Sequence, residues 1–488
     1  MTIKNVARDV LPDPRPIIGS GRVRWEGGSA HRHVYAATGE VTVAVPLVGP
    51  DVVDSAVREA RRASVDWRKT PVDQKRRLLW DLARAVERNA DELAALQVAE
   101  NGTPRMNASH YPSLVADCLE YYAGWPDKLV GNVNPVWPAS GFDYDVLEPH
   151  GVVVIIIPWN SPLYSLGSVI APALAAGNAV IVKPPELTPF TSLRFAELAL
   201  EVGFPPGVIN VVPGGGEVGS QLVSHDDVDM IHFTGSGPTA TRILTSAARN
   251  LTPVGLELGG KSPNLVFADA DLEAAAAGAV QYCMQLSGQG CLNGSRLLVE
   301  DSVFDDMVEL VTARVKDIAV GDPVDPSTTF GPVINDAAVS RIMGMIERAR
   351  GNSGGRVVTG GNRLGGEYTS GYYIEPTVVA DVNPNSEIAQ EEVFGPVLSM
   401  LRFTGDDAAL ELANDSRYGL ASYVQTTDVT RAHRFAAAID TGMVWVNGTS
   451  GLPPSIPFGG VKQSGVGRLG GRAGLELFSR VKNVWIAR

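Results

Sequence analysis

Residues 151–160 read GVVVIIIPWN, six β-branched aliphatic residues in a row between a glycine and a proline. A half-exposed strand alternates apolar and polar residues, whereas this run is apolar at every position. That pattern is typical of a parallel strand that helices cover on both faces. The run is also far too short to span a bilayer, and we expect no membrane segment in this chain. The stretch therefore predicts a central strand of an α/β domain.

Similar segments continue on both sides of this strand. Apolar segments at 179–183, 208–212, 229–235 and 253–260 alternate with helix-like segments near 165–176, 191–203 and 239–250. Beyond Lys261 the alternation resumes, with helices expected near 271–286 and 301–318 and strands near 295–300 and 396–403. Such alternation is typical of parallel sheets with helical crossovers. The sequence predicts two α/β domains in tandem, the first Rossmann-like, with a seam near 258–262.

Three flanking segments have other patterns. Residues 51–97 have apolar residues at helical spacing and a break at Thr70-Pro71, which predicts two amphipathic helices. Residues 129–149 are rich in Pro, Gly and aromatic residues without a helical period, which indicates an extended hairpin leaving the main body. The segment 476–487 alternates like an edge strand. We expect the hairpin to pair with another subunit.

The overall composition excludes several classes of protein. With 54 acidic and 41 basic residues, the 488-residue chain has a formal charge of −13, which disfavours nucleic acid or an anionic membrane as a partner. The amino terminus has no apolar core of signal-peptide length. Three cysteines without zinc or redox spacing predict neither a disulfide framework nor a metal site. We therefore expect a cytoplasmic protein.

Two glycine-rich segments each match a dinucleotide-binding loop. Residues 214–219 (GGGEVG) and 235–240 (GSGPTA) both follow apolar strands, but both cannot bind one pyrophosphate in the usual way. Either segment could instead be a tight strand-to-helix turn. Glu257 lies 22 residues after Gly235, where such a motif places a ribose-binding carboxylate. Its apolar, glycine-flanked surroundings instead favour a buried carboxylate with a raised pKa, as in a general base.

The segment 286–296, LSGQGCLNGSR, contains a single cysteine among small residues. Taken alone, Cys291 is more readily interpreted as a small buried packing residue than as a nucleophile. Cysteine is nevertheless strongly nucleophilic, so that modest activation suffices for catalysis. The residues by themselves leave both interpretations open for Cys291 and favour simple packing for Cys118 and Cys283.

Seven segments, in order along the chain, resemble the aldehyde dehydrogenase superfamily from about residue 45 to the carboxyl end. They are IIPWNSPL (156–163), VKPPELTP (182–189), FTGS (233–236), LELGGKSPN (256–264), GQGC (288–291), EEVFGPV (391–397) and PFGGVKQSGVGR (457–468). The resemblance implies NAD(P)-dependent oxidation of an aldehyde to the acid through a cysteine thiohemiacetal and thioester. It assigns Cys291 as nucleophile, Asn160 with the Cys291 N–H as oxyanion donors, and Glu257 as general base.

The resemblance also implies a set of cofactor contacts. Lys183 and Glu186 would bind the adenosine ribose, and Glu392 the nicotinamide ribose. The other implied contacts are Trp159, Gly216, Thr234, Gly235, Ser236, Leu258 and Phe394. A glutamate at 186 repels a 2′-phosphate, so NAD is expected in preference to NADP, which some relatives with this glutamate accept.

The family architecture implies three parts and a homodimer or homotetramer. Residues 1–129 and 148–258 would form the NAD-binding domain, 259–455 the catalytic domain, and 130–147 with 456–488 the oligomerisation region. The segment 447–458 would line the substrate channel, and it contains no arginine or lysine that could bind a substrate carboxylate. With Tyr164, Trp445 and Phe458 as further candidates, an apolar or aromatic aldehyde is expected. Ser161 and Asn293 depart from the residues usual at their positions.

Three alternatives within the same fold give other reactions or none. A CoA-acylating dehydrogenase would pass the acyl group to a thiol, but retention of Glu257 argues against it. A non-redox thioester or ester hydrolase would leave the residues at 183, 186 and 392 without a purpose. A catalytically inactive structural member would have no need of Asn160, Glu257 and Cys291 together.

Overall fold

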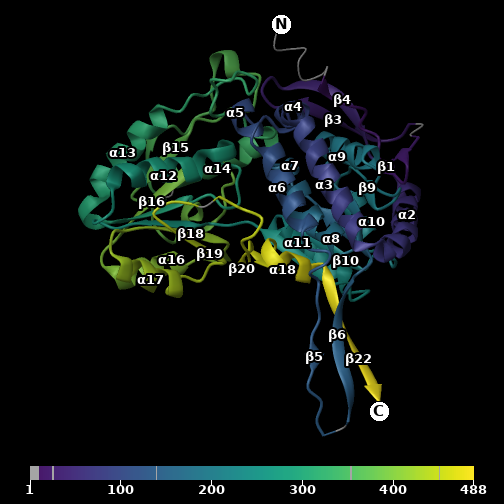
Figure 1. The fold of residues 1–488 in the computed structure, drawn as a ribbon. Helices are drawn as coiled ribbons and strands as arrows, with labels where there is room; N and C mark the ends of the chain where they lie inside the picture. The colour runs from purple at the N-terminus through teal and green to yellow at the C-terminus, as the bar shows by residue number, and fades with distance from the viewer. Residues whose placement is uncertain (1–9, 25–26, 139, 352–353, 450, 488) are drawn as a thin grey trace.

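The structure is a computed structural model that describes residues 10–24, 27–138, 140–351, 354–449 and 451–487. Parts of the expected domains therefore lie outside the described residues, namely 1–9, 25–26, 139, 352–353, 450 and 488. Two lobes, each built around a sheet, lie side by side, and a narrow arm projects away from them (Figure 1). None of the described helices is long and apolar enough to cross a membrane.

The first lobe contains an eight-stranded sheet. Across the sheet the strands are β2 (Gly21–Arg22), β1 (Ile17–Ile18), β9 (Ile209–Val211), β8 (Ala179–Lys183), β7 (Val152–Ile156), β10 (Met230–Gly235), β11 (Val254–Leu258) and β21 (Gly465–Val466). The strands from β9 to β11 are parallel, whereas the edges pair antiparallel. The 151–160 stretch thus provides a central strand, β7, as its composition predicts.

Helices cover both faces of this sheet, which explains why β7 is apolar throughout. Val152 and Val154 pack in one core with α2 (Pro50–Lys69), α10 (Gly216–Val223) and α11 (Gly237–Ala247). Val153 and Ile155 pack in another core, on the opposite face. Its helices are α3 (Val72–Arg88), α6 (Tyr111–Ala123), α8 (Ala171–Ala175) and α9 (Phe190–Glu201). The second helix expected within 51–97 ends at Arg88, and the separate α4 (Ala90–Asn101) follows Asn89.

The second lobe contains a seven-stranded sheet that is parallel except at one edge. Its order is β14 (Arg356–Thr359), β15 (Thr377–Ala380), β16 (Val397–Phe403), β13 (Arg296–Glu300), β12 (Pro263–Val266), β18 (Ala421–Gln425) and β19 (Met443–Val446). The helices of this lobe are α12 (Leu272–Met284), α13 (Phe304–Lys316), α14 (Asp336–Gly351), α15 (Glu387–Gln390), α16 (Asp406–Asn414) and α17 (Val429–Ala438). The chain enters this lobe through residues 259–262, between β11 and β12.

The arm is a three-stranded antiparallel sheet of β22 (Ser479–Ala487), β6 (Gly141–Pro149) and β5 (Val133–Asn134). In Figure 1 it extends well beyond both lobes and carries the described carboxyl end. Of the described part of the segment 456–488, which was expected to belong to this region, only β22 lies in the arm. Strand β21 joins the first sheet, and α18 (Gly471–Leu477) comes next in the chain. Both elements belong to the first lobe, because Leu469, Leu475 and Phe478 are buried in its core.

The smaller elements complete the chain. They are β3 (Ala30–Tyr35) with β4 (Glu40–Pro46), β17 (Tyr418–Gly419) with β20 (Val461–Lys462), α5 (Arg105–Ala108), α7 (Pro162–Ser165), the π-helical η1 (Leu166–Ile170), and the short 3₁₀ turns η2 (Gln285–Gly288), η3 (Asp301–Val303) and η4 (Gly366–Tyr368).

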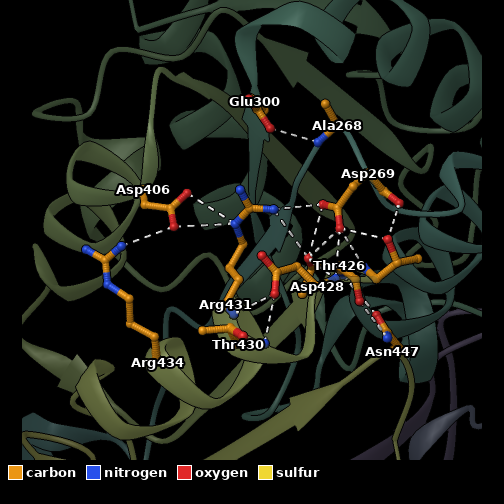
Figure 2. A network of polar contacts seen from close by, with 11 residues as sticks. Ala268, Asp269, Glu300, Asp406, Thr426, Asp428, Thr430, Arg431, Arg434 and Asn447 are labelled. Carbon is orange, nitrogen blue, oxygen red and sulfur yellow. Dashed lines mark hydrogen bonds and ion pairs between the residues drawn. The ribbon is translucent and has the colours of Figure 1, made fainter.

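A polar network ties two strand ends of the second lobe together (Figure 2). Asp269, after β12, accepts hydrogen bonds from the backbone N–H groups of Thr427 at 2.7 Å and Asp428 at 2.9 Å, after β18. Arg431 bridges Asp269 at 3.0 Å and Asp406 at 3.1 Å. Burial opposes ionisation of Asp269, but the hydrogen bonds from Thr426, Thr427 and Asp428 outweigh it and hold the pKa of Asp269 at about 2.

This network predicts an acid-sensitive contribution to stability. The pKa of Asp269 is lower in the folded state, so its contribution is complete above about pH 4 and is lost as the pH falls toward 2. Asp269→Asn should lower the free energy of unfolding at pH 7 by on the order of 1–2 kcal/mol and flatten its dependence on acid. Urea unfolding at pH 7 and pH 3 tests this. Asp407→Asn, at a 95% exposed side chain that pairs only with Arg434, is the matched control; equal effects of the two changes would contradict the prediction.

Candidate active site

Cys291 follows a tight left-handed turn that other loops hold in place. Leu286, Ser287 and Gly288 all have positive φ, and a Cβ on Gly288 would lie 2.1 Å from the backbone carbon of Gly395. Only glycine fits this close approach. The Oγ of Ser287 donates to the Gly331 carbonyl at 2.8 Å. The thiol therefore sits on a rigid loop between α12 and β13, although its own side chain is partly exposed.

The surroundings of Cys291 keep its thiol protonated. Burial, and next the carboxylates of Glu392 and Glu257, raise the pKa of Cys291 to about 12, while the backbone N–H groups of Cys291 and Leu292 act in the opposite direction. The other two cysteines are fully buried, and the thiol of Cys283 donates to a backbone carbonyl. Both fit the packing role expected for them.

Asn160 lies directly against the Cys291 loop. It follows β7, and its Nδ2 donates to the carbonyl of Gln289 at 2.8 Å. An amide nitrogen carries two hydrogens, so one remains for another acceptor. Asn101 donates to the backbone carbonyl of Asn160 at 3.2 Å and steadies that turn. The side chain of Asn160 is thus held with its NH₂ group toward the segment that carries the cysteine.

Glu257 is a buried carboxylate near the carboxyl end of β11. Its side chain is 4% exposed, and its Oε2 has no hydrogen-bond partner among the described residues. Burial raises the pKa of Glu257 well above its ordinary value, and the guanidinium of Arg468 opposes this. The Oε1 lies 2.7 Å from the position of a Cβ on Gly459. A raised pKa makes the carboxylate a stronger base than a solvated one, which suits the role of a general base.

Two glycines after Glu257 bring the two lobes into contact. A Cβ on Gly259 would lie 2.1 Å from Oε2 of Glu392, and one on Gly260 would lie 2.6 Å from the carbonyl oxygen of Cys291. The N–H of Gly260 donates to Oε1 of Glu392 at 3.0 Å. Burial raises the pKa of Glu392 to about 7, although the hydrogen bond from Gly260 acts to lower it. Residues 257–260 thus connect the base, the cysteine loop and the second buried carboxylate.

A second group of candidate residues gathers around Glu186. Burial lowers the pKa of Lys183, the last residue of β8, to about 8, and Glu186 opposes the shift. The carboxylate of Glu186 lies 3.6 Å from the position of a Cβ on Gly215, just before α10. No heavy atom of the described residues lies within 4 Å of a Cβ built on Gly216. The side chains of Lys183 and Glu186 can donate to and accept from the hydroxyls of a sugar. The open space at the start of α10 suits a phosphate, because backbone N–H groups at a helix start favour anions.

The remaining candidates lie along the carboxyl-terminal edge of the first sheet, except Phe394, which precedes β16 of the second lobe. Thr234 pairs with Glu257 and Gly235 with Leu258 in the register of β10 and β11. Ser236 is at the N-cap position of α11, where its hydroxyl donates to that of Thr239 at 3.1 Å rather than accepting from a backbone N–H. The rings of Trp159 and Phe394 meet edge to face, with centroids 5.4 Å apart. Parallel strands bind ligands at their carboxyl ends, and the candidates from the first lobe lie at such ends or directly follow them.

Sequence reasoning missed three residues that position this site. Gln289 accepts from Asn160 through its backbone, and its side-chain Oε1 accepts from the N–H of Ile334 at 2.9 Å. Gly459 leaves room for Glu257, and Arg468 lies beside both. The glycine pair in the PFGG segment is the one sequence signal that could have pointed to such a close approach. Asn293 is turned toward the interior, where it donates to the Cys283 carbonyl at 2.8 Å.

Comparison with known proteins matches this geometry to one family. The model of the aldehyde dehydrogenase family matches residues 25–484. The chain belongs to the aldehyde dehydrogenase family. An aldehyde dehydrogenase-like protein of Schizosaccharomyces pombe is 42% identical over 450 residues, or 92% of this chain and 90% of that protein.

Solved aldehyde dehydrogenase structures are similar over the whole chain. PnpE of Pseudomonas sp. WBC-3, in complex with nicotinamide adenine dinucleotide, is 39% identical with a TM-score of 0.95, over 97% of this chain and 98% of that one. Betaine aldehyde dehydrogenase of Staphylococcus aureus, in complex with NAD⁺, is 34% identical with a TM-score of 0.95. The match covers 98% of this chain and 95% of that one.

The family membership confirms several predictions made from the sequence. The resemblance is confirmed, and so is the fold class of two parallel-sheet α/β units with a small β element. This aldehyde dehydrogenase is an oxidoreductase that oxidises an aldehyde with a nicotinamide dinucleotide.

The glycine pair of this aldehyde dehydrogenase can be tested directly. The new Cβ of Gly260→Ala would clash with the backbone oxygen of Cys291, and that oxygen can move only if the whole cysteine loop moves. The displaced loop should lower kcat by about 10²-fold or more. Gly259→Ala meets only the end of the Glu392 side chain, so it should mainly raise KM for the dinucleotide. Steady-state kinetics with thermal unfolding separates the two. Gly49→Ala, where a Cβ has open space, is the control; a normal kcat for Gly260→Ala would refute the argument.

Proposed function

We propose that this aldehyde dehydrogenase oxidises its substrate through a thiohemiacetal and a thioester on Cys291, with hydrolysis by Glu257. The contact of residues 257–260 with both Cys291 and Glu392 carries the proposal, because it brings a thiol and a proton acceptor to one place. As the Sγ of Cys291, which is partly exposed, bonds to the aldehyde carbon, the thiol proton passes to solvent water and the carbonyl oxygen becomes an alkoxide. The free hydrogen of Asn160 Nδ2 and the N–H of Cys291 stabilise that charge.

The residues around Glu186 fit NAD as the cofactor. Lys183 and Glu186 would bind the adenosine ribose, with the carboxylate repelling the 2′-phosphate of NADP. Gly216 and the start of α11 at Gly235 and Ser236 offer N–H groups for the pyrophosphate. The other expected contacts are Trp159, Thr234, Leu258, Glu392 and Phe394. When bound, the oxidised nicotinamide accepts the hydride that leaves the thiohemiacetal carbon.

Glu257 completes the reaction. The thioester needs a water molecule that has lost a proton, and the Oε2 of Glu257 is a buried acceptor that no described residue occupies. Because its pKa is raised, the carboxylate is a stronger base than a solvated one, and it can return the proton when the acid leaves. A thiol such as CoA would not need this base, which favours hydrolysis over acyl transfer.

Single variants of the two proposed catalytic residues should separate the steps of the reaction. Cys291→Ala should abolish NADH formation, whereas Glu257→Gln should release one NADH per site in a burst and then turn over at least about 10²-fold more slowly. With the wild-type enzyme, kcat/KM should be about tenfold or more higher with NAD than with NADP. Stopped-flow absorbance with and without CoA measures these quantities. A wild-type reaction that needs CoA would favour the CoA-acylating alternative. NADH formation by Cys291→Ala would refute the proposed role of Cys291.

We further propose that the arm makes the enzyme a homodimer or homotetramer. The arm stands clear of both lobes and exposes apolar side chains on two of its strands, including Phe142 at 48%, Trp485 at 43% and Ile486 at 52%. Exposed apolar side chains beside unpaired strand edges are typical of surfaces that pair with another chain. Light scattering should give a dimer or tetramer, and Ile486→Asp should weaken it. A monomeric wild type would refute this.

The cysteines favour a cytoplasmic location. All three are free in the structure. A reducing compartment keeps such thiols available, and the proposed nucleophile needs one of them reduced. Titration of the freshly purified, denatured enzyme with a thiol reagent should count three thiols; fewer would argue for an oxidising compartment.

A further inference from the structure

The carboxyl end of α4 is anchored to the start of α9. Glu100 is buried there, and its carboxylate accepts hydrogen bonds from the N–H groups of Phe190 at 2.8 Å and Thr191 at 3.2 Å. The first N–H groups of a helix have no partner within the helix, and a carboxylate satisfies them well. Asn101, the next residue and the last of α4, is therefore held at a fixed place beside the first lobe's sheet.

The side chain of Asn101 holds the backbone on both sides of Asn160. Its Nδ2 donates to the carbonyls of Trp159 and Asn160, each at 3.2 Å. These carbonyls belong to the two peptide groups that flank the Cα of Asn160, so fixing both fixes the direction of its Cα–Cβ bond. The Oδ1 of Asn101 accepts from the N–H of Thr103 at 3.0 Å and from its hydroxyl at 2.7 Å. The amide thus uses both its donors and both its acceptor positions, and a flipped orientation would lose all four bonds.

The same end of α4 also packs against the second lobe. A Cβ on Gly102 would lie 2.8 Å from Cγ of Pro332, and a Cβ on Gly331 would lie 2.5 Å from the carbonyl oxygen of Gly102. The carbonyl of Gly331 accepts the hydrogen bond from Ser287, which holds the turn before Cys291. One short stretch of α4 therefore contacts the turn that carries the oxyanion donor and the support of the cysteine loop.

The surroundings of Asn101 indicate a role beyond ending its own helix. Asn101, Asn160, Ser287 and Gln289 line one small cavity between the lobes. The cap of α4 is made by Gly102, whose N–H donates to the Val98 carbonyl at 3.0 Å. Among the described residues, the amide of Asn101 makes no bond to its own helix, and its two donors are directed at the Asn160 turn.

We propose that Asn101 is a positioning residue for aldehyde oxidation, which aims the free hydrogen of Asn160 Nδ2 at the alkoxide by holding both peptide groups of Asn160. The inference rests on the proposed function, in which Asn160 stabilises that alkoxide. A donor stabilises the charge only if it already points at it, and a misplacement of about 1 Å can cost about 10²-fold in rate. Asn101 acts only through Asn160, so its loss should cost nothing once Asn160 is gone.

A double-mutant cycle tests this dependence. The readout is kcat/KM at saturating NAD, with the best substrate among propanal, hexanal and benzaldehyde. Asn160→Ala should lower kcat/KM by about 10²- to 10³-fold, and Asn101→Ala by about tenfold or more. The double variant should match Asn160→Ala within about twofold, because the second change removes the aim of a donor that is no longer present. A residue needed only for stability would instead lower the rate by a similar factor in both backgrounds.

Asn178 provides the matched control. It is also buried, its Nδ2 donates to the carbonyls of Ala173 at 3.0 Å and Phe478 at 2.9 Å, and its Oδ1 accepts from the N–H of Gly151 at 3.0 Å. It precedes β8, at the opposite end of the strands from the candidate site. Asn178→Ala should lower the unfolding temperature as Asn101→Ala does, but it should keep the wild-type kcat/KM.

Three results would overturn the inference alone. They are a wild-type kcat/KM in Asn101→Ala, a double variant in which the two losses multiply, and an equal loss in Asn178→Ala. A wild-type kcat/KM in Asn160→Ala would overturn the proposed role of Asn160 and this inference together. Thermal unfolding shows whether each variant is folded at the assay temperature. If Asn101→Ala is not, Asn101→Ser takes its place in the cycle, because its short side chain cannot reach both carbonyls and the same outcomes apply.

Discussion

The close approach of Gly259 and Gly260 to the second lobe is the constraint on which the active site depends. The backbone there passes within contact distance of the carbonyl of Cys291 and the carboxylate of Glu392, with no room for a side chain. Glu257, on the first lobe, reaches the cysteine loop of the second only because these two residues lack Cβ atoms. The site is thus assembled across a boundary between two sheets, and neither lobe contains it alone.

Burial at this boundary disfavours the charged forms of the active-site groups. The carboxyl groups of Glu257 and Glu392 lie near the thiol of Cys291, and burial is the main cause that raises the pKa of each group. The raised pKa of each group favours its neutral form and makes it more ready to exchange protons than a fixed charge would be. Around Asp269 the opposite holds, because hydrogen bonds and Arg431 keep a carboxylate ionised for structure. The same side-chain chemistry serves catalysis or rigidity according to what surrounds it.

The sequence predicted the fold class well because its strongest signals are local. The apolar run at 152–157 reports burial on both faces, and motif segments identify the candidates at 160, 257 and 291. What it could not give are contacts between distant segments. Gln289 orients Asn160 through a backbone carbonyl, and any residue type has one. The assignment of 456–488 to one region likewise overlooked that Leu475 and Phe478 are buried in the first lobe, a property of tertiary packing.

The arm has a consequence for how the protein is made. Strand β6 takes its long partner β22 from the far end of the chain, and the bond between Lys482 and Glu148 spans 334 residues. While a ribosome synthesises the chain, β6 can pair early with the short β5, but it can pair with β22 only after residues 479–487 have been made. The sheets of both lobes can form earlier, because all their strands precede β22 in the chain. The three-stranded arm is therefore complete only after β22 has been made, and any pairing between subunits through β22 follows that point.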